Sequence, residues 1–89
     1  FSMIEITNAT GWTISFDGRV LETFSTDNSR MHINGIKSIE VKAGKKGDLW
    51  IMVAGRWSGG ITMSGFDPGK QGEIDELVAQ VKAGITNAG

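Results

Sequence analysis

Residues 67–82 read DPGKQGEIDELVAQVK, and this stretch decides the fold. Its apolar residues recur at the i, i+3, i+4 and i+7 positions that form one face of an α-helix, namely Ile74, Leu77, Val78 and Val81. Polar and charged side chains fill the opposite face. The spacing therefore predicts one amphipathic helix from Asp67 to Lys82. A helix this short does not persist alone in water, so the rest of the chain must supply a surface that covers its apolar face.

Both ends of this helix carry recognisable signals. Asp67 can accept hydrogen bonds from free backbone N–H groups as the N-cap, and Pro68 suits the first helical position because it has no N–H to leave unpaired. Gly69 and Gly72 weaken this first turn, which favours a start of regular helix nearer Gly72. Gly84 can take the left-handed conformation that ends many helices. We therefore expect the helix to stop at Gly84 and residues 84–89 to fray.

The chain before this helix consists of short segments that alternate apolar and polar residues, the pattern of half-buried β-strands. We expect strands at residues 3–7, 12–16, 19–24, 30–33, 36–42, 49–54 and 61–66. Turn residues separate these segments, and Asn34-Gly35 predicts a tight turn before residues 36–42. Six or seven short strands followed by one helix need no parallel crossover, so we expect the strands to pair antiparallel.

Asp17-Gly18 is the strongest hairpin signal in the chain, because a type I′ turn needs positive φ at both central residues. With Asp17-Gly18 as the two-residue loop, Ile14 faces Leu21 across the hairpin. This register places Trp12, Ile14 and Phe16 on one inner face, where apolar side chains meet apolar side chains.

Residues 49–54 read LWIMVA and do not alternate. A run that is apolar on both faces is typical of a central strand covered on both sides, or of a strand whose outer face meets a partner. The sequence leaves both interpretations open.

These elements indicate an α+β, mainly β fold in a single domain that spans residues 1–89. The expected architecture is a strongly bent antiparallel sheet or open barrel of six to seven strands, capped at one open end by the C-terminal helix. A two-sheet sandwich would use the same strands and remains the alternative.

The order of elements resembles the pleckstrin-homology-like (PH-like) superfold, in particular its short bacterial versions. The features that carry the resemblance are the hairpin WTISFDGRVLET at 12–23, the segment RMHINGIKSIEV at 30–41 and the terminal helix after FDP at 66–68. The resemblance implies a binding or assembly module and not an enzyme. Its lipid-binding members place basic residues around the first hairpin loop, whereas the corresponding residues 8–11 include no Lys or Arg.

Composition excludes several classes of protein. The chain has no cysteine, which excludes disulfides and thiolate zinc sites, and its formal net charge of −1 argues against a nucleic-acid binder. No apolar run approaches membrane-spanning length, so we expect a cytoplasmic protein without a transmembrane segment. Phe1-Ser2 before Met3 resembles the remnant of a cleaved expression tag, and on that interpretation the chain is complete; the alternative is a module cut from a longer protein.

No residue pattern meets the requirements of catalysis. Residues 65–71 connect a strand to the helix, but they lack the glycine spacing and the Ser or Thr of a phosphate-binding loop. His32 is the only histidine, so neither a zinc site nor a catalytic triad has the partners it needs. We therefore expect a non-enzymatic protein without a cofactor or a metal.

Lys42, Lys45 and Lys46 form the only basic cluster, at an expected hairpin tip. One interpretation is contact with a phosphate or an anionic membrane surface. The other is a solvated turn whose lysines prevent edge pairing with other chains.

Arg56 and Trp57 lie in a glycine-rich turn, and these two residue types are the commonest energetic anchors of protein interfaces. The alternative is that Trp57 folds over the open end of the barrel and joins Trp12 and Trp50 in the core. The first functional hypothesis is protein–protein contact or self-association through residues 49–54 and Arg56-Trp57. The second is binding of phospholipid headgroups or an anionic membrane surface through the Lys42–Lys46 tip.

Overall fold

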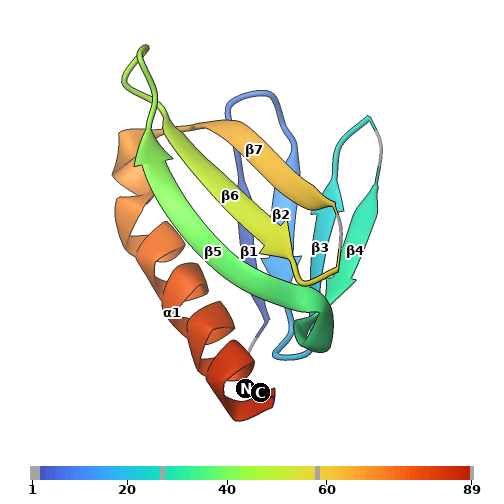
Figure 1. Ribbon diagram of the computed structural model, residues 1–89. Coiled ribbons are helices and arrows are strands. Elements are labelled where there is room, and N and C mark those ends of the chain that lie inside the picture. The colour runs from blue at the N-terminus through green and yellow to red at the C-terminus, as the bar shows by residue number, and fades with distance from the viewer. Residues whose placement is uncertain (1–2, 27, 58, 89) are drawn as a thin grey trace.

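The structure, a computed structural model, describes residues 3–26, 28–57 and 59–88. These residues form seven β-strands, two 3₁₀ turns and one α-helix (Figure 1). The strands are β1 Ile4–Thr7, β2 Thr13–Phe16, β3 Val20–Phe24, β4 Ser29–His32, β5 Ile36–Ala43, β6 Leu49–Gly55 and β7 Gly60–Phe66. The 3₁₀ turns are η1 Ile33–Gly35 and η2 Pro68–Lys70, and the helix is α1 Gln71–Ala88.

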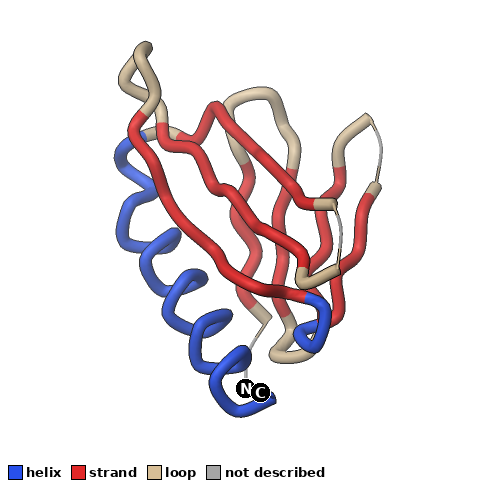
Figure 2. The backbone as a smooth tube through the Cα atoms, in the orientation of Figure 1, coloured by secondary structure: helices blue, strands red, loops and turns tan. Residues whose placement is uncertain are grey.

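The strands form two antiparallel sheets, one of order β1-β2-β3-β4 (sheet A) and one of order β5-β6-β7 (sheet B). Figure 2 shows the two sheets as separate layers, with α1 running along β5. The expected α+β, mainly β class with a C-terminal helix is confirmed. The expected single bent sheet or open barrel is wrong, because the described strands pair only within their own sheet.

The chain passes from sheet A to sheet B at η1. Asn34 and Gly35, expected to form a tight turn, belong to this 3₁₀ turn, and Ile33 at its start is buried. The His32 imidazole caps the turn, because its Nδ1 accepts a hydrogen bond from the Asn34 N–H at 3.1 Å. Ile33 therefore enters the core instead of ending a strand, and β5 begins a new sheet at Ile36.

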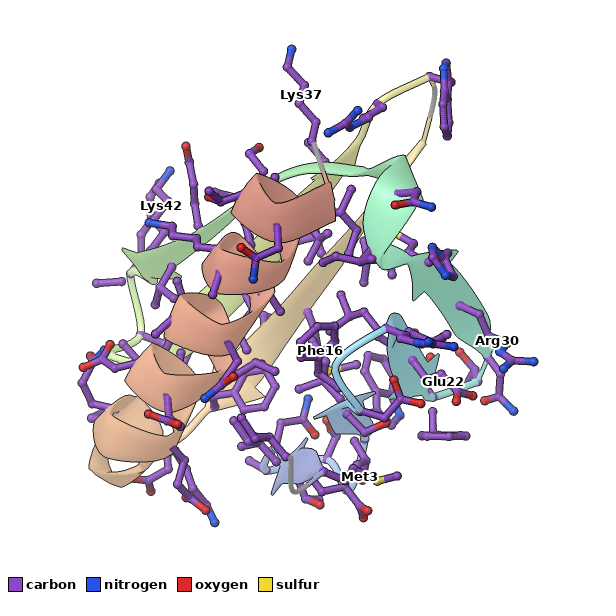
Figure 3. The ribbon with its side chains drawn as sticks, turned by 90° about the horizontal axis from the view of Figure 1, so that it is seen from below. Met3, Phe16, Glu22, Arg30, Lys37 and Lys42 are labelled. Carbon is purple, nitrogen blue, oxygen red and sulfur yellow. The ribbon has the colours of Figure 1, made fainter. Side chains whose placement is uncertain are left out.

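The apolar face of α1 closes the side of the molecule between β1 and β5, the edge strands of the two sheets. Ile74, Leu77 and Val81 are fully buried, as their spacing predicts, and Val78 packs against the same core. The rest of the core comes from the inward faces of both sheets and from η1. Figure 3 shows Phe16 pointing into this interior, toward the helix.

Regular helix begins at Gln71, next to Gly72 as expected, but the predicted signals at its two ends act differently. Asp67 caps η2 rather than the helix, because its carboxylate accepts a hydrogen bond from the Gly69 N–H at 2.7 Å. At the other end the helix continues through Gly84 to residue 88, so the expected stop at Gly84 and the expected fraying of residues 84–88 are wrong, whereas Gly89 lies outside the described residues. Gly84 serves packing instead, since a Cβ added there would lie 3.0 Å from the Ile33 side chain.

The β2–β3 hairpin has a different register from the one expected. Phe16, and not Ile14, pairs with Leu21, and Ile14 pairs with Thr23. Side chains alternate with a period of two, so this two-residue shift keeps Ile14 and Phe16 on the inner face. All four paired side chains are buried. Trp12, expected beside Ile14 and Phe16, precedes β2 and is 37% exposed, so that part of the prediction is wrong.

The turn of this hairpin explains the shift. Gly18 and Arg19, rather than Asp17 and Gly18, are its central residues, and Gly18 has φ of 99°. A type II′ turn places glycine at this first central position. The Asp17 carboxylate accepts hydrogen bonds from the backbone N–H groups of Arg19 at 2.9 Å and Val20 at 2.8 Å. Asp17 therefore caps the turn from the position just before its two central residues.

Burial alternates along β6 although its residues are apolar on both faces. Leu49, Ile51 and Val53 are buried in the core, whereas Trp50 is exposed and Met52 is half-buried on the outer face. The interpretation of residues 49–54 as a strand covered on both sides is therefore wrong. Sheet B leaves the outer face of its central strand uncovered.

The Asp17 cap predicts a specific pH dependence. Hydrogen bonds from the backbone N–H groups of Val20 and then Arg19 hold the pKa of Asp17 below its ordinary value of 3.8. A carboxyl group whose folded-state pKa is lowered contributes stability above its unfolded pKa, and this contribution is lost as pH falls through the folded pKa. We predict that Asp17→Asn destabilises the protein at neutral pH and weakens its loss of stability below about pH 4.

The measurement is urea unfolding of both proteins at a series of pH values. Asp75→Asn removes one carboxylate from the exposed face of α1 and is the matched control for the loss of charge. An unchanged pH dependence in Asp17→Asn would contradict the assignment.

Candidate functional site

A groove of about 570 Å³ lies at the tip of the β5–β6 hairpin, which protrudes at the top of Figure 1. Lys42, Lys45 and Lys46 line it together with Trp50, and we call it the lysine groove. Lys42 and Trp50 are cross-strand partners on the outer face of sheet B. The structure therefore brings the predicted basic cluster together around an indole ring.

Asp48 holds the indole of Trp50 in place. One carboxylate oxygen, Oδ2, accepts hydrogen bonds from Trp50 Nε1 at 3.0 Å and from the Gly65 N–H of β7 at 2.9 Å. Gly44 leaves the space for this arrangement, because a Cβ added there would collide with the Asp48 carboxylate and lie 2.6 Å from Trp50 Nε1. The wall of the groove is thus set by specific contacts and not by a loose turn.

A buried amide connects this wall to sheet A. Asn8 is 7% exposed, and its Nδ2 donates a hydrogen bond to the Ser64 carbonyl of β7 at 2.8 Å. Its Oδ1 accepts hydrogen bonds from the backbone N–H groups of Thr10 and Trp12 at 3.1 and 2.9 Å. Asn8 therefore joins the turn between β1 and β2 to the part of β7 that also supports Asp48.

The charge of the lysine groove favours anions. The three lysines are exposed, and no ion pair involves them within the described part of the chain. Among the described residues, Asp48 is the only acidic one that lines the groove, and its Oδ2 already accepts two hydrogen bonds. The arrangement can hold an anion between ammonium groups beside an aromatic face.

Sequence reasoning found the lysines but missed Asp48, Trp50 and Gly44 as parts of one site. The signal was available in part, since Trp50 sits at an outward position beside the hairpin tip. What linked it to Asp48 is the bond from Gly65, which comes from a strand 17 residues away in sequence.

Arg56 and Trp57 lie at the opposite end of β6, after the strand ends at Gly55 (Figure 1). Trp57 is 81% exposed, so the alternative in which it joins a core with Trp12 and Trp50 is wrong; each of those two is 37% exposed. The backbone nevertheless holds this pair, because the Arg56 N–H donates to the Gly35 carbonyl of η1 at 2.9 Å. The structure does not bring the pair near the lysine groove.

A third surface was not predicted from the sequence. The outer face of sheet A carries a groove of about 450 Å³, which we call the glutamate groove. Residues of β1, β2 and β3 line it together with Met3, which precedes β1. The lining residues are Met3, Glu5, Thr13, Ser15, Glu22 and Phe24. Glu22 is the one that makes an ion pair, with Arg30 at 3.6 Å, among the described residues.

Other residues considered for chemistry have structural roles. His32 is occupied as the cap of η1. The connector before α1 is held by the Asp67 cap, and its Lys70 pairs with Glu73 at 3.4 Å. In residues 3–26, 28–57 and 59–88, no three His, Cys, Asp or Glu side chains gather into a possible metal site.

The packing at Gly44 yields a testable prediction. Gly44→Ala should displace the Asp48 carboxylate and the Trp50 indole, and it should lower the free energy of unfolding by about 1–3 kcal/mol, because the two hydrogen bonds that Asp48 accepts are each worth about 0.5–1.5 kcal/mol. The checks are urea unfolding and the indole N–H resonance of Trp50 by NMR. Gly72→Ala, whose added Cβ meets nothing within 4 Å, is the control and should leave that resonance unchanged. An unmoved Trp50 resonance in Gly44→Ala would contradict the packing described.

Comparisons with known proteins add no assignment to this geometry. No protein-family model matches the chain, and no curated protein sequence matches it. Within the described residues, no helix combines the length and the apolar character needed to cross a membrane.

Proposed function

We propose that this chain is a non-enzymatic, PH-like interaction module that contacts other protein surfaces through Arg56 and Trp57. The observation that carries the proposal is the position of Trp57, 81% exposed beside an exposed arginine at the end of β6. A four-stranded and a three-stranded antiparallel sheet followed by a C-terminal helix support the PH-like assignment.

Energetics favour an interface at this position. An aromatic side chain of this size buries roughly 150–250 Å² when covered, and few other residue types contribute as much binding energy. Core packing does not explain the tryptophan at position 57, because the core contains none of the three tryptophans. Its indole lies beside Gly35 of η1, where a Cβ added to the glycine would be 3.6 Å from the ring. The ring therefore packs beside the backbone of this 3₁₀ turn.

The outer face of β6 extends the same argument. Trp50 and Met52 point away from the core on β6, the strand that ends at Gly55 just before Arg56. Uncovered apolar side chains on a central strand are typical of surfaces that meet a partner. This face supports the hypothesis that residues 49–54 contribute to the contact.

Site-specific photo-crosslinking tests the proposed function. We place p-benzoylphenylalanine at position 57 or, as a control at another exposed tryptophan, at position 12. We expect covalent protein adducts from position 57 in the cells that produce this protein, with the partner identified by mass spectrometry. Equal adduct formation at both positions, or none at position 57, would remove the support for Trp57 as a contact residue.

The lysine groove supports a second function, binding to an anionic membrane surface. The groove lies at a protruding tip, and lysines near an anionic bilayer contribute about 1 kcal/mol each. A partly exposed tryptophan such as Trp50 suits the boundary between water and lipid, since its ring is apolar and its N–H is polar. This surface differs from the first hairpin loop that the lipid-binding PH-like proteins use.

Charge reversal tests the membrane hypothesis. We predict that Lys42→Glu, Lys45→Glu and Lys46→Glu combined lower partition onto phosphatidylserine-containing vesicles roughly a hundredfold, since three contributions are lost. The control combines Arg19→Glu, Lys37→Glu and Lys82→Glu, which change the net charge equally at other exposed positions. Equal effects of the two variants would mean that net charge alone governs binding. No binding by the wild-type chain would end the hypothesis.

A further inference from the structure

We propose that the glutamate groove receives Arg56 and Trp57 of a second copy of this chain, so that copies associate head to tail. This inference rests on the proposed function and names the partner of the same residues. It follows from two features of the fold, an exposed cationic and aromatic pair and a groove of opposite charge on another face of the molecule.

The register of sheet A builds the groove. Ser15 of β2 pairs with Glu5 of β1 on one side and with Glu22 of β3 on the other. A small residue between two long ones leaves a depression, and Ser15 at its floor is only 6% exposed. Thr13, the next outward residue of β2, extends the floor toward Phe24, its partner on β3.

The rim of the groove is apolar, whereas its floor is polar. Met3 is 59% exposed and Phe24 is 44% exposed, and both line the groove. Together with Trp57 they are the three most exposed of the large hydrophobic side chains in the described residues. Covering the rim with an indole would remove apolar surface of both copies from water.

The charges of the two surfaces are complementary. Glu5 and Glu22 contribute two carboxylates, and Arg30 offsets part of this charge from one side. Arg56 makes no ion pair among the described residues. A guanidinium placed between the two carboxylates can donate to both, and its planar fork suits carboxylate geometry.

The spacing of the two pairs also matches. Glu22 and Phe24 are two residues apart on one face of β3, which places them about 7 Å apart along the strand. Arg56 and Trp57 are adjacent in the chain, so their side chains can span a similar distance. The indole would then lie over Thr13 beside Phe24, with the guanidinium between Glu5 and Glu22.

One molecule cannot fill its own groove. The pair leaves the end of β6 in sheet B, whereas the groove is on the face of sheet A that points away from sheet B. Figure 3 shows Met3 and Glu22 on the side of the molecule opposite Lys37 of β5, with the core between them. A contact between different patches of identical copies is heterologous, and it continues into rings or chains.

Mixing of two variants tests this arrangement by sedimentation velocity. We expect the wild-type chain to associate in a concentration series that reaches about 1 mM, the range of weak contacts. Trp57→Ala and the combination of Glu5→Lys with Glu22→Lys should each weaken association at least about tenfold, as loss of an anchor does. A mixture should form a one-to-one heterodimer, because one variant keeps the groove and the other keeps the tryptophan.

Three controls secure the result. Trp12→Ala removes another exposed tryptophan and should associate like the wild type. Glu5→Gln with Glu22→Gln removes charge without like-charge repulsion of Arg30, and it should weaken association as well. Thermal melts of each variant must show a cooperative transition, so that loss of association is not loss of the fold.

The outcomes separate this inference from the proposed function. Association that depends on Trp57 but not on the glutamates, or no heterodimer on mixing, would overturn the groove as the receiving site and leave Trp57 as a contact residue. A monomeric wild type at every concentration would overturn the second copy as partner, while photo-crosslinking at position 57 independently tests for another protein. Association unaffected by Trp57→Ala would overturn the head-to-tail arrangement, and the crosslinking at position 57 would then decide the proposed function alone.

Discussion

Burial of one face of α1 against the edges of both sheets is the interaction on which the rest of the structure depends. Ile74, Leu77 and Val81 are fully buried, and each contributes roughly 1.5–3 kcal/mol through the apolar surface removed from water. Without this face, the core between β1 and β5 would be open to solvent along one side. Gly84 and Ile33 extend the contact to the turn that joins the two sheets.

A polar connection on β7 complements the apolar one. The Asn8 amide bonds the β1–β2 turn to Ser64, and the neighbouring Gly65 N–H bonds to Asp48 of the β5–β6 hairpin. Burying an amide is costly unless its hydrogen bonds are made, and here both ends of the Asn8 side chain are satisfied. The connection therefore specifies one relative placement of the first turn, β7 and the lysine groove.

The functional hypotheses converge on β6, the central strand of sheet B. Its inner face contributes to the core, its outer face presents Trp50, one end meets the lysine groove and the other leads to Arg56 and Trp57. A strand anchored on both edges holds such groups in fixed relation. Sheet A contributes a surface of opposite charge, which comes from Glu5 and Glu22. The surface is hollowed because Ser15, their cross-strand neighbour, is short. The outer faces of sheet A and sheet B are therefore both available for contacts.

The sequence by itself determined the elements whose signals are local. The apolar spacing of residues 74–81 defines the buried face of the helix, and alternation defines most strands and their inward residues, because both patterns follow from backbone periodicity. The basic cluster and the Arg56-Trp57 pair were likewise visible as residue types. Even the wrong hairpin register at Ile14 preserved the inner face, since a shift of two residues keeps side-chain orientation.

Only the tertiary structure decided what depends on contacts between distant segments. Gly84 carries the signal of a helix end, yet the helix continues through it, and the glycine leaves space for the Ile33 side chain. LWIMVA has no polar face to orient it, so the helix, η1 and sheet A together determine which side is buried. The lysine groove needs Gly65 of β7 to fix Asp48 and Trp50. Local patterns contain no record of such partners, because close packing and cross-sheet hydrogen bonds exist only once the chain has folded.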